Sequence, residues 1–358
     1  MVKINKKIRD INYEKCKISV IIPCRDEEKY IGKCLDSIIK QEYPINNLEV
    51  FVVDGMSQDG TKRIIINYIQ EYPFIKLLNN PDKITPAAMN IGIKKASGNF
   101  ILILGAHSMI DKKFIKKNYQ SLKNNCVDCV GGIGIAVPTS NSLVSKSISI
   151  VTSHPFGVGN AYFRIGIKKT KYVDTVPFGC YRREVFEKIG FFDEDLVRNQ
   201  DDEFNLRLIK NGGKILLVPD IISYYYARDS MYKLWKMYFQ YGYFKPLVVK
   251  KVGGILTWRQ IIPSSFIGSI ILALLLSFFT SVFFWLFLFI VGLYTTVNFS
   301  LSLIISIKKK DLRLLPFLIA SFITLHFSYG FGYLKGIWDF IVFKKHLKKK
   351  IKDMPLTR

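Results

Sequence analysis

The sequence has 358 residues, of which 49% are hydrophobic, and its 52 Lys and Arg against 28 Asp and Glu give a formal net charge of +24. This length exceeds a single small module and suits one catalytic domain joined to a membrane segment. Because many of the basic residues flank long apolar runs, the charge favours anionic lipid as a partner and argues against nucleic acid.

The N-terminus is basic and leads into a short strand-like run, residues 17–23. Only a few apolar residues precede Arg25, fewer than the apolar core of a secretory signal requires. We therefore expect the first domain to stay in the cytosol, where its six cysteines remain reduced.

Strand-like and helix-like segments then alternate as far as residue 134. Residues 17–23, 48–54 and 100–104 are rich in β-branched side chains, and segments with apolar residues at helical spacing separate them. This alternation predicts an α/β fold, with a mostly parallel sheet covered by helices on both faces.

Polar or glycine-bearing stretches follow each of these strands. Ligands of such sheets bind beyond the carboxyl ends of the strands, so residues 24–27, 54–61 and 105–108 are expected to form a ligand site. The first stretch holds no GxGxxG pattern, which disfavours a dinucleotide-dependent dehydrogenase. The glycines within 131–134 come too late in the chain and are interpreted as a bend.

The middle of the chain is less regular. Residues 138–176 show no period and contain several Pro and Gly residues, which predicts a long loop over the active face. Residues 184–220 return to helical spacing. Residues 228–245 predict a helix with one apolar face, which lies either at the membrane interface or against the protein core.

Two long runs without charged side chains follow. Residues 261–307 contain no Asp, Glu, Lys or Arg and would extend about 70 Å as a helix, enough for two spans joined by a tight turn. Residues 314–334 form a third run between Arg313 and Lys335. The alternative is a buried core helix of a soluble protein, but such helices are rarely this long or this poor in charge.

These patterns predict a multi-pass protein of the cell membrane whose catalytic domain faces the cytosol. The expected parts are a catalytic domain (1–227), an interfacial region (228–260), a transmembrane region (261–334, with spans at about 261–281, 284–307 and 314–334) and a basic tail (335–358). Two spans return the chain to the cytosol at the basic residues 308–313, as the positive-inside rule expects. A third crossing would leave the lysine-rich tail outside, so the third run is expected to be re-entrant or interfacial, unless the charge rule fails here. The oligomeric state is unknown at this point.

Four stretches in order carry a resemblance that covers about residues 17–245. They are VIIPCRDEEKYI (20–31), VVDGMSQDGT (52–61), TPAAMNIGIKKASGNFILILGAHS (85–108) and VPFGCYRREVFEKIGFFDEDLVRNQDDEFNLRL (176–208). Together they resemble the family 2 glycosyltransferases, in particular the membrane-attached bacterial group that builds succinoglycan-type exopolysaccharides. The resemblance implies a GT-A fold, a nucleotide-diphospho-sugar donor, a divalent metal (Mg or Mn) and inversion at the anomeric carbon by direct displacement.

Such a reaction needs two kinds of group. Negative charge builds on the departing diphosphate, and a metal ion or basic side chains must neutralise it. The acceptor hydroxyl is a poor nucleophile, so a carboxylate must take its proton as it attacks.

The resemblance assigns six residues to the donor site: Pro23, Arg25, Glu27, Asp54, Asn90 and Gly105. Asp54 is expected to contact the base or ribose of the nucleotide. Its alternative role is a turn in the Asp-Gly-x-Ser segment, whereas Asp59 is expected to cap the next helix.

The expected metal motif is incomplete. Family members carry Asp-x-Asp or Asp-x-His after the third strand, and here Gly105, Ala106 and His107 occupy these positions. His107 can ligate a metal as a neutral imidazole, with the donor phosphates and water as the main other ligands. A metal-free mechanism that uses lysines is the alternative, and so is a plain strand-end role for His107.

The acceptor site matches the resemblance more closely. The Glu-Asp pair of the family falls on Gln200 and Asp201, and Asp201 is the expected catalytic base. Asp202 points about 100° away on a helix, so only one of the two aspartates is expected to face the cleft. Asp201 has an alternative role in stabilising the helix N-terminus. Residues expected to support this site are Pro177, Gly179, Asn199, Gln200, Asp202 and Arg207, and Arg207 is expected to pair with a carboxylate or with the diphosphate.

The predicted function is transfer of a sugar to a lipid-linked saccharide acceptor in extracellular polysaccharide biosynthesis. One alternative is a transferase that places a single sugar on polyprenyl phosphate. A processive synthase is disfavoured because no Gln-x-x-Arg-Trp motif follows residue 208. An alternative of another class is a non-catalytic membrane scaffold that retains the fold, which Gly105 and Gln200 favour.

Overall fold

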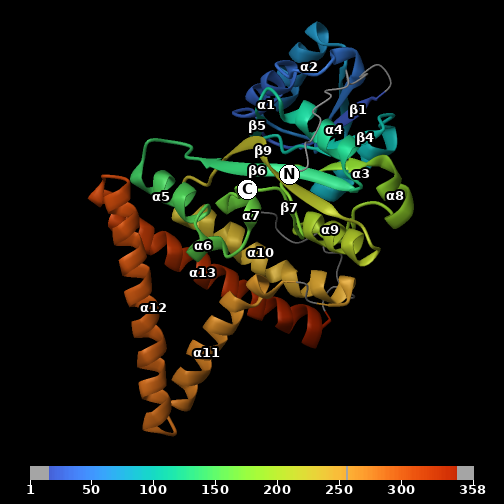
Figure 1. The fold of residues 1–358 in the computed structure, drawn as a ribbon. Coiled ribbons are helices and arrows are strands. Elements are labelled where there is room, and N and C mark those ends of the chain that lie inside the picture. The colour runs from blue at the N-terminus through green and yellow to red at the C-terminus, as the bar shows by residue number, and fades with distance from the viewer. Residues whose placement is uncertain (1–15, 255–256, 345–358) are drawn as a thin grey trace, which may run out of the picture.

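The computed structural model describes residues 16–254 and 257–344 (Figure 1). Most of the predicted basic tail, residues 345–358, and the N-terminal residues 1–15 lie outside the described part. Within it, a domain of strands and helices lies above a set of long C-terminal helices, two of which extend away from it (Figure 1).

A nine-stranded mixed sheet forms the centre of the upper domain, with the strand order β3-β2-β1-β4-β8-β6-β9-β5 and β7 paired to β9. The strands are β1 (Ile18–Cys24), β2 (Leu48–Asp54), β3 (Ile75–Asn79), β4 (Phe100–Ile103), β5 (Ser108–Ile110), β6 (Cys129–Val137), β7 (Lys171–Tyr172), β8 (Cys180–Arg182) and β9 (Ile215–Tyr226). Strands β3, β2, β1 and β4 pair in parallel, as predicted for β1, β2 and β4, whereas β3 was not expected from the sequence. Strand β8 is antiparallel to both its neighbours, so the second half of the sheet is mixed.

The parallel half of the sheet is buried on both faces, which explains its continuous apolar sequence. All seven residues of β2 are buried. In β1, Ile18, Val20 and Ile22 belong to one apolar cluster and Ile21 to another, because successive side chains point to opposite faces. The register Cys24↔Asp54 brings the carboxyl ends of β1 and β2 to the same edge, where the ligand site was expected.

Helices cover both faces of this sheet. The helices of the upper domain are α1 (Ile31–Ile39), α2 (Thr61–Glu71), α3 (Thr85–Lys95), α4 (Phe114–Asn124), α5 (Leu143–Val151), α6 (Pro155–Val158), α7 (Tyr162–Ile165), α8 (Arg183–Ile189) and α9 (Gln200–Lys210). One apolar cluster joins the sheet to α1, α2 and α4. The other joins it to α3, α8 and α9.

Three expectations for the middle of the chain are corrected. The glycines within 131–134 lie inside β6 and not at a simple bend, and the pairing of β6 with β9 shifts register between Gly131 and Ile133. A Cβ at Gly132 would lie 1.8 Å from the Ile221 carbonyl oxygen, so this close approach requires glycine. Residues 138–176 hold the helices α5, α6 and α7, and the segment expected to be helical as far as 220 enters β9 at residue 215.

Two long helices, α10 (Met231–Val252) and α13 (Leu315–Gly336), run side by side beneath the upper domain (Figure 1). Their backbones approach closely at glycines: a Cβ at Gly332 would lie 2.1 Å from the Phe239 carbonyl oxygen. Leu234 and Tyr238 of α10 are buried, while Trp235 is 38% exposed. The predicted apolar face of α10 therefore packs partly against protein, and its place in a membrane interface stays a prediction.

The remaining helices, α11 (Ile262–Leu276) and α12 (Ser281–Lys308), form a hairpin whose tip is the part of Figure 1 farthest from the sheet. The tip residues Phe278 and Phe279 are each 82% exposed. Among the described residues, Ser281–Lys308 and Leu312–Val342 are long and apolar enough to cross a membrane, whereas α11 has 15 residues. At 1.5 Å per residue α11 extends about 22 Å, less than the roughly 30 Å of a hydrocarbon core. The predicted division into spans stays a prediction.

Candidate active site

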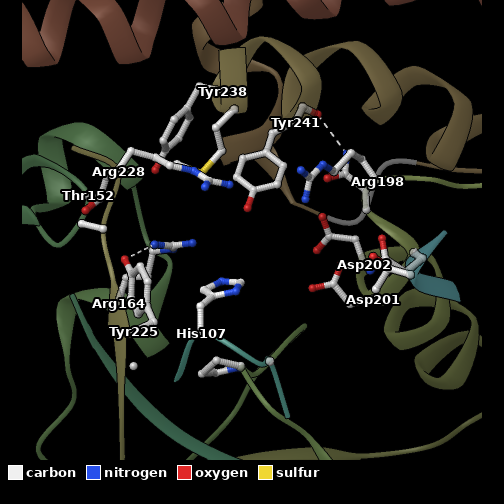
Figure 2. A pocket seen from close by; sticks show the side chains of 18 of the residues that line it. His107, Thr152, Arg164, Arg198, Asp201, Asp202, Tyr225, Arg228, Tyr238 and Tyr241 are labelled. Carbon is white, nitrogen blue, oxygen red and sulfur yellow. Dashed lines mark hydrogen bonds between the residues drawn. The ribbon is translucent and has the colours of Figure 1, made fainter. Parts of the chain in front are cut away.

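One cavity of about 1400 Å³ connects the loops at the carboxyl edge of the sheet with the C-terminal helices. The loops after β1, β2 and β4 line one end of it. Side chains of α11, α12 and α13 line the other end, and the N-terminal turn of α9 lies between them. Figure 2 shows His107, Asp201 and Asp202 in this cavity, below α10 and α13.

The loop after β1 supplies the donor end of the cavity. Pro23, Arg25 and Glu27 all line it, as the assignment to the nucleotide pocket requires. The loop is held to the start of α2, because the backbone N–H of Glu27 donates to Thr61 Oγ1 at 2.7 Å. The N–H of Glu28 donates to Asp59 Oδ2 at 3.1 Å. These bonds fix the two loops as one unit.

Asp54, the last residue of β2, and Asp59 in the following loop make different contacts. The Asp54 carboxylate is buried and accepts hydrogen bonds from the Ser57 backbone and hydroxyl, the latter at 2.5 Å. It is not among the side chains that line the cavity, so its nucleotide contact stays a prediction beside its role in the turn. Asp59 accepts from the N–H of Thr61, the first residue of α2, at 3.0 Å and also lines the cavity, whereas the N-cap position itself is Gly60.

Asn90 lies on α3, away from the cavity lining. Its side-chain amide donates to the Phe192 carbonyl at 2.9 Å and to Glu194 Oε1 at 2.8 Å, and its oxygen accepts from the Phe192 N–H at 3.0 Å. These bonds hold the chain segment that leads to α9. The structure thus gives Asn90 a positioning contact, and its assignment to the donor site stays a prediction.

His107 lies in the loop after β4, and its side chain faces the cavity. Its Nδ1 lies 3.1 Å from Glu27 Oε1, and its side chain is 44% exposed. A carboxylate on one ring nitrogen is the usual way in which an imidazole is oriented toward a metal ion, and it leaves Nε2 directed elsewhere. A Cβ at Gly105 would lie 3.1 Å from the Phe178 ring, so a larger residue at this position requires the ring to shift slightly.

A complete protein metal centre is not formed by the part of the chain that the structure describes. No group of three or more His, Cys, Asp or Glu side chains there is placed to share an ion. The His107 imidazole, oriented by Glu27, is a side chain that fits a cation whose other ligands would come from the diphosphate of a bound donor.

The segment before β8 forms the floor of the site. Pro177 and Gly179 both line the cavity, and their support of an acceptor stays a prediction. Phe178 between them has a φ of 48°, which turns the chain sharply at this point. A Cβ at Gly179 would lie 2.8 Å from the Tyr181 ring, so the glycine permits the tight packing of the floor.

The N-terminus of α9 places the two aspartates. Asn199 precedes the helix in a left-handed conformation with a φ of 59°, and its side-chain amide donates to the Tyr241 carbonyl at 2.9 Å. Gln200, Asp201 and Asp202 follow, and all of them line the cavity. The expectation that only one aspartate faces the cleft is therefore corrected.

The two aspartates differ in their partners. Asp202 is bound by the ammonium group of Lys245 from α10, a lysine whose side chain is 5% exposed. Asp201 lines the cavity and its side chain is exposed there, surrounded by the cavity walls. Removal from bulk water and then the Asp202 charge raise the pKa of Asp201 to about 6, while backbone N–H groups and Lys245 act in the opposite direction. A carboxylate with such a pKa is suited to general-base catalysis near neutral pH.

Arg207 lies on the part of α9 that turns away from the cavity. Its guanidinium pairs with Glu203 at 2.7 Å and donates to the carbonyl of Phe191 at 2.8 Å. It thus contacts a carboxylate, one of its two expected partners, and ties α9 to the segment after α8. A contact between Arg207 and a diphosphate stays a prediction.

Four arginines that line the cavity, Arg164, Arg198, Arg228 and Arg259, were missed in the sequence, and two of them follow runs of aromatic residues. Arg164 comes from α7, and Arg228 follows the end of β9 (Figure 2). The Arg164 guanidinium donates to the hydroxyl of Tyr225 and stacks on its ring at 5.1 Å. The only local signal was the concentration of aromatic residues beside Arg164 and Arg228, in AYFR and YYYAR.

The far end of the cavity is apolar and aromatic. Phe266 of α11 and Tyr294 of α12 contact each other there, with ring centroids 4.8 Å apart. Phe156 of α6 lies 4.9 Å from the ring of His326, whose Nε2 is 2.7 Å from the Phe156 carbonyl oxygen. The C-terminal helices therefore form part of the cavity wall and are not a separate attachment.

Comparison with known proteins identifies what this architecture resembles. The profile of glycosyl transferase family 2 matches residues 19–190. The dolichyl N-acetyl-α-D-glucosaminyl phosphate 3-β-D-2,3-diacetamido-2,3-dideoxy-β-D-glucuronosyltransferase of Methanococcus voltae is 36% identical over 240 residues, which cover 65% of this chain and 74% of the relative. The succinoglycan biosynthesis protein ExoA of Rhizobium meliloti is 26% identical over 226 residues, or 62% of this chain and 67% of the relative.

A solved structure shares the fold. The mannosyltransferase of Pyrobaculum calidifontis, in complex with GDP-Man and Mn²⁺, superposes with a TM-score of 0.58 and covers 90% of this chain and 88% of its own. Its identity of 17% carries a likeness of fold alone. With the family profile, it confirms the predicted GT-A fold.

Proposed function

Since the chain belongs to glycosyl transferase family 2 and is a glycosyltransferase, we propose that it moves a sugar from a nucleotide-diphospho-sugar to a lipid-linked acceptor, with inversion at the anomeric carbon. The observation that carries this proposal is the single cavity from the loops after β1, β2 and β4, past Asp201, to the apolar helices α11–α13. A nucleotide and a lipid would enter such a cavity from opposite ends.

The proposed chemistry is a direct displacement. The Asp201 carboxylate takes the proton of the acceptor hydroxyl while that oxygen attacks the anomeric carbon. The bond from the anomeric carbon to the donor phosphate oxygen breaks, and its electron pair leaves with the nucleoside diphosphate. The raised pKa of Asp201 supports this role, because the carboxylate is ionised at neutral pH yet basic enough to accept the proton.

A divalent cation fits beside this reaction. His107 would hold it through Nε2 while Glu27 orients the ring through Nδ1. When bound, the ion supplies positive charge to the departing diphosphate. Lysines and Arg25 at the same end of the cavity are the alternative source of that charge, because Arg25, Lys29 and Lys83 also line it.

The acceptor class is supported by the relatives and by the helices. The Methanococcus voltae relative is named for transfer to a dolichyl-linked sugar phosphate, and the Rhizobium meliloti relative for succinoglycan biosynthesis. The aromatic lining at Phe266, Tyr294 and Tyr329 is suited to the first units of a prenyl chain. Participation in extracellular polysaccharide biosynthesis is part of this proposal.

The membrane arrangement is also proposed. The helix Ser281–Lys308, which is long and apolar enough to span a bilayer, would anchor the chain together with α11, with the sheet domain on the cytosolic side, where nucleotide sugars are present. The packing of α13 along α10 supports an interfacial position for the third apolar run.

The test is an acceptor competition in purified membranes. A panel of nucleotide sugars first identifies the donor by thermal stabilisation, since ligand binding raises apparent stability in proportion to occupancy. The same saccharide is then offered with and without a polyprenyl diphosphate. We expect transfer to the lipid-linked form to dominate. Equal transfer to the soluble saccharide would contradict the proposed acceptor.

A further inference from the structure

The two arginines on the acceptor side of the cavity lack a carboxylate partner. Among the residues that the structure describes, Arg228 forms no hydrogen bond or ion pair, and Arg164 forms its only hydrogen bond with the phenol of Tyr225. Both are partly buried. Asp201 and Asp229 lie near enough to act on these charges, but in the described part of the chain neither forms an ion pair with Arg164 or Arg228. A partly buried guanidinium that no carboxylate binds directly is suited to an anionic ligand.

Arg198, which also lines the cavity, donates to Gln240 Oε1 at 3.0 Å, and three further cations there pair with a carboxylate. Lys245 is bound to Asp202, and Lys233 lies 2.9 Å from Asp229. Arg259 is held by Asp174 through both of its terminal nitrogens. The charge of these three cations is largely neutralised within the protein, which sets Arg164 and Arg228 apart.

The surroundings of the two arginines are suited to phosphate. Tyr225, Tyr238 and Tyr241 line the cavity beside them, and Thr152 of the α5 end lies on the same side (Figure 2). The phenols and the Asp201 carboxylate act on the charge of Arg164, which shows that these groups are close. Guanidinium groups with neighbouring hydroxyls bind phosphate oxygens in several directions at once.

The position of the arginines favours the acceptor over the donor. They come from α7 and from the end of β9, and Tyr238 and Tyr241 come from α10. None of these elements belongs to the loops after β1, β2 and β4, where the nucleotide is expected. Beyond the arginines, the cavity wall changes to Phe266, Tyr294 and Tyr329 of the C-terminal helices.

We propose that Arg164 and Arg228 bind the phosphate groups through which the acceptor sugar is attached to its lipid. The sugar then reaches toward Asp201 and His107, while the prenyl chain follows the aromatic wall of α11–α13. This inference rests on the proposed lipid-linked acceptor and adds the site that distinguishes it from a soluble saccharide.

The experiment measures binding and needs no sugar transfer. The full-length protein in a neutral detergent is titrated with geranylgeranyl diphosphate, with geranylgeraniol as the uncharged match, and separately with UDP and GDP. The variants are Arg164→Gln, Arg228→Gln and the double variant. Arg63→Gln is the matched control, because Arg63 is exposed on α2 and outside the cavity lining.

We expect each single substitution to weaken binding of geranylgeranyl diphosphate about tenfold, and the double variant to bind it no better than the alcohol. Binding of the nucleoside diphosphate that the wild type prefers should be unchanged, which also shows that the variants are folded. Arg164→Lys is a second variant that keeps the charge if Arg164→Gln fails to fold.

Two results would overturn the inference. If nucleoside diphosphate binding falls as much as lipid diphosphate binding, the arginines serve the donor. If lipid diphosphate binding is unchanged, they bind no acceptor phosphate. Either result leaves the acceptor competition described above intact, so the failure of this site and the failure of the proposed function are distinguishable.

Discussion

At the scale of single residues, the arrangement of Asp201, Asp202 and Lys245 determines how the site responds to pH. Asp201 has its pKa raised to about 6, whereas Asp202 is bound by a lysine from a different helix. The ammonium group of Lys245 therefore neutralises Asp202, one of the two adjacent negative charges. The other carboxylate keeps the proton affinity that a general base requires.

This arrangement predicts a specific pH profile. Activity should rise as pH increases through about 6, because only the ionised Asp201 accepts a proton. Asp202→Asn removes a like charge and leaves Lys245 to act on Asp201, so the acidic limb of kcat/KM should move to lower pH. The measurement is the pH dependence of kcat/KM, with the exposed Asp220→Asn as control. If the acidic limb of kcat/KM lies at the same pH in Asp202→Asn as in the wild type, the assignment of that limb to Asp201 is contradicted.

The same shift affects stability with a defined sign. The folded state holds the Asp201 proton more tightly than the unfolded chain, whose aspartates titrate near a pKa of about 4. Ionisation of Asp201 therefore lowers the free energy of unfolding progressively between that value and about 6, and the full loss remains at higher pH.

His107 gives the second prediction at this scale. If its Nε2 ligates the metal, His107→Ala should weaken Mn²⁺ binding in the presence of the nucleoside diphosphate by about tenfold or more. Electron paramagnetic resonance of Mn²⁺ measures this without turnover. His154→Asn is the matched control, because His154 caps α6 through its side chain and asparagine can replace that cap. Equal Mn²⁺ affinity in His107→Ala would favour the mechanism in which basic side chains neutralise the diphosphate.

At the scale of elements, the parallel half of the sheet was predictable and the mixed half was not. Strands β1, β2 and β4 are continuous apolar runs followed by polar loops, a local pattern with a single interpretation. Strands β5 and β8 have three residues each and owe their pairing to distant neighbours. The long strand β9 contains Pro219 and follows a helix. Its first residues were therefore predicted to continue that helix.

The site shows the same division between local and distant signals. His107 and Asp201 each follow a recognisable local segment, and both were found. The bond between Asp202 and Lys245 joins residues 43 positions apart, and Arg164 and Arg228 line the same cavity only when β9 and α7 fold together. No pattern within a short window encodes such a pair.

The contact between α10 and α13 yields a prediction for an element. Gly332 lies where the two backbones approach, and Gly292 of α12 has no neighbour within 4 Å of an added Cβ. Gly332→Ala should push the helices apart and lower the free energy of unfolding by roughly 1–3 kcal/mol, as overpacking does. Gly292→Ala should not. Thermal unfolding in one detergent compares the two, and equal melting temperatures would contradict the close packing.

At the scale of the whole molecule, the C-terminal helices both complete the cavity and expose apolar surface. Trp285, Phe289 and Leu293 of α12 are 68%, 65% and 54% exposed, although the helix bears no charge before Lys308. An exposed apolar surface of this extent is typical of contact with lipid. The catalytic site would then lie directly above the bilayer surface.

This arrangement predicts how strongly the chain is retained in membranes. Phe289→Asp combined with Leu293→Asp places two charges where the hydrocarbon is expected, at a cost of several kcal/mol. The fraction that remains in membranes after an alkaline wash should fall strongly. The matched control is Ile66→Asp combined with Tyr172→Asp, two exposed apolar residues of the sheet domain. Equal retention of both variants would contradict the membrane position of α12.

The most direct test of the account concerns the carboxylate of Asp201. Single-turnover transfer is measured for wild type and Asp201→Asn with saturating donor and lipid-linked acceptor, and donor affinity is measured in parallel. The account predicts unchanged donor affinity and a transfer rate about 10²–10⁴ times lower, the usual contribution of a general base. Equal transfer rates at equal donor affinity would show that Asp201 is not the base.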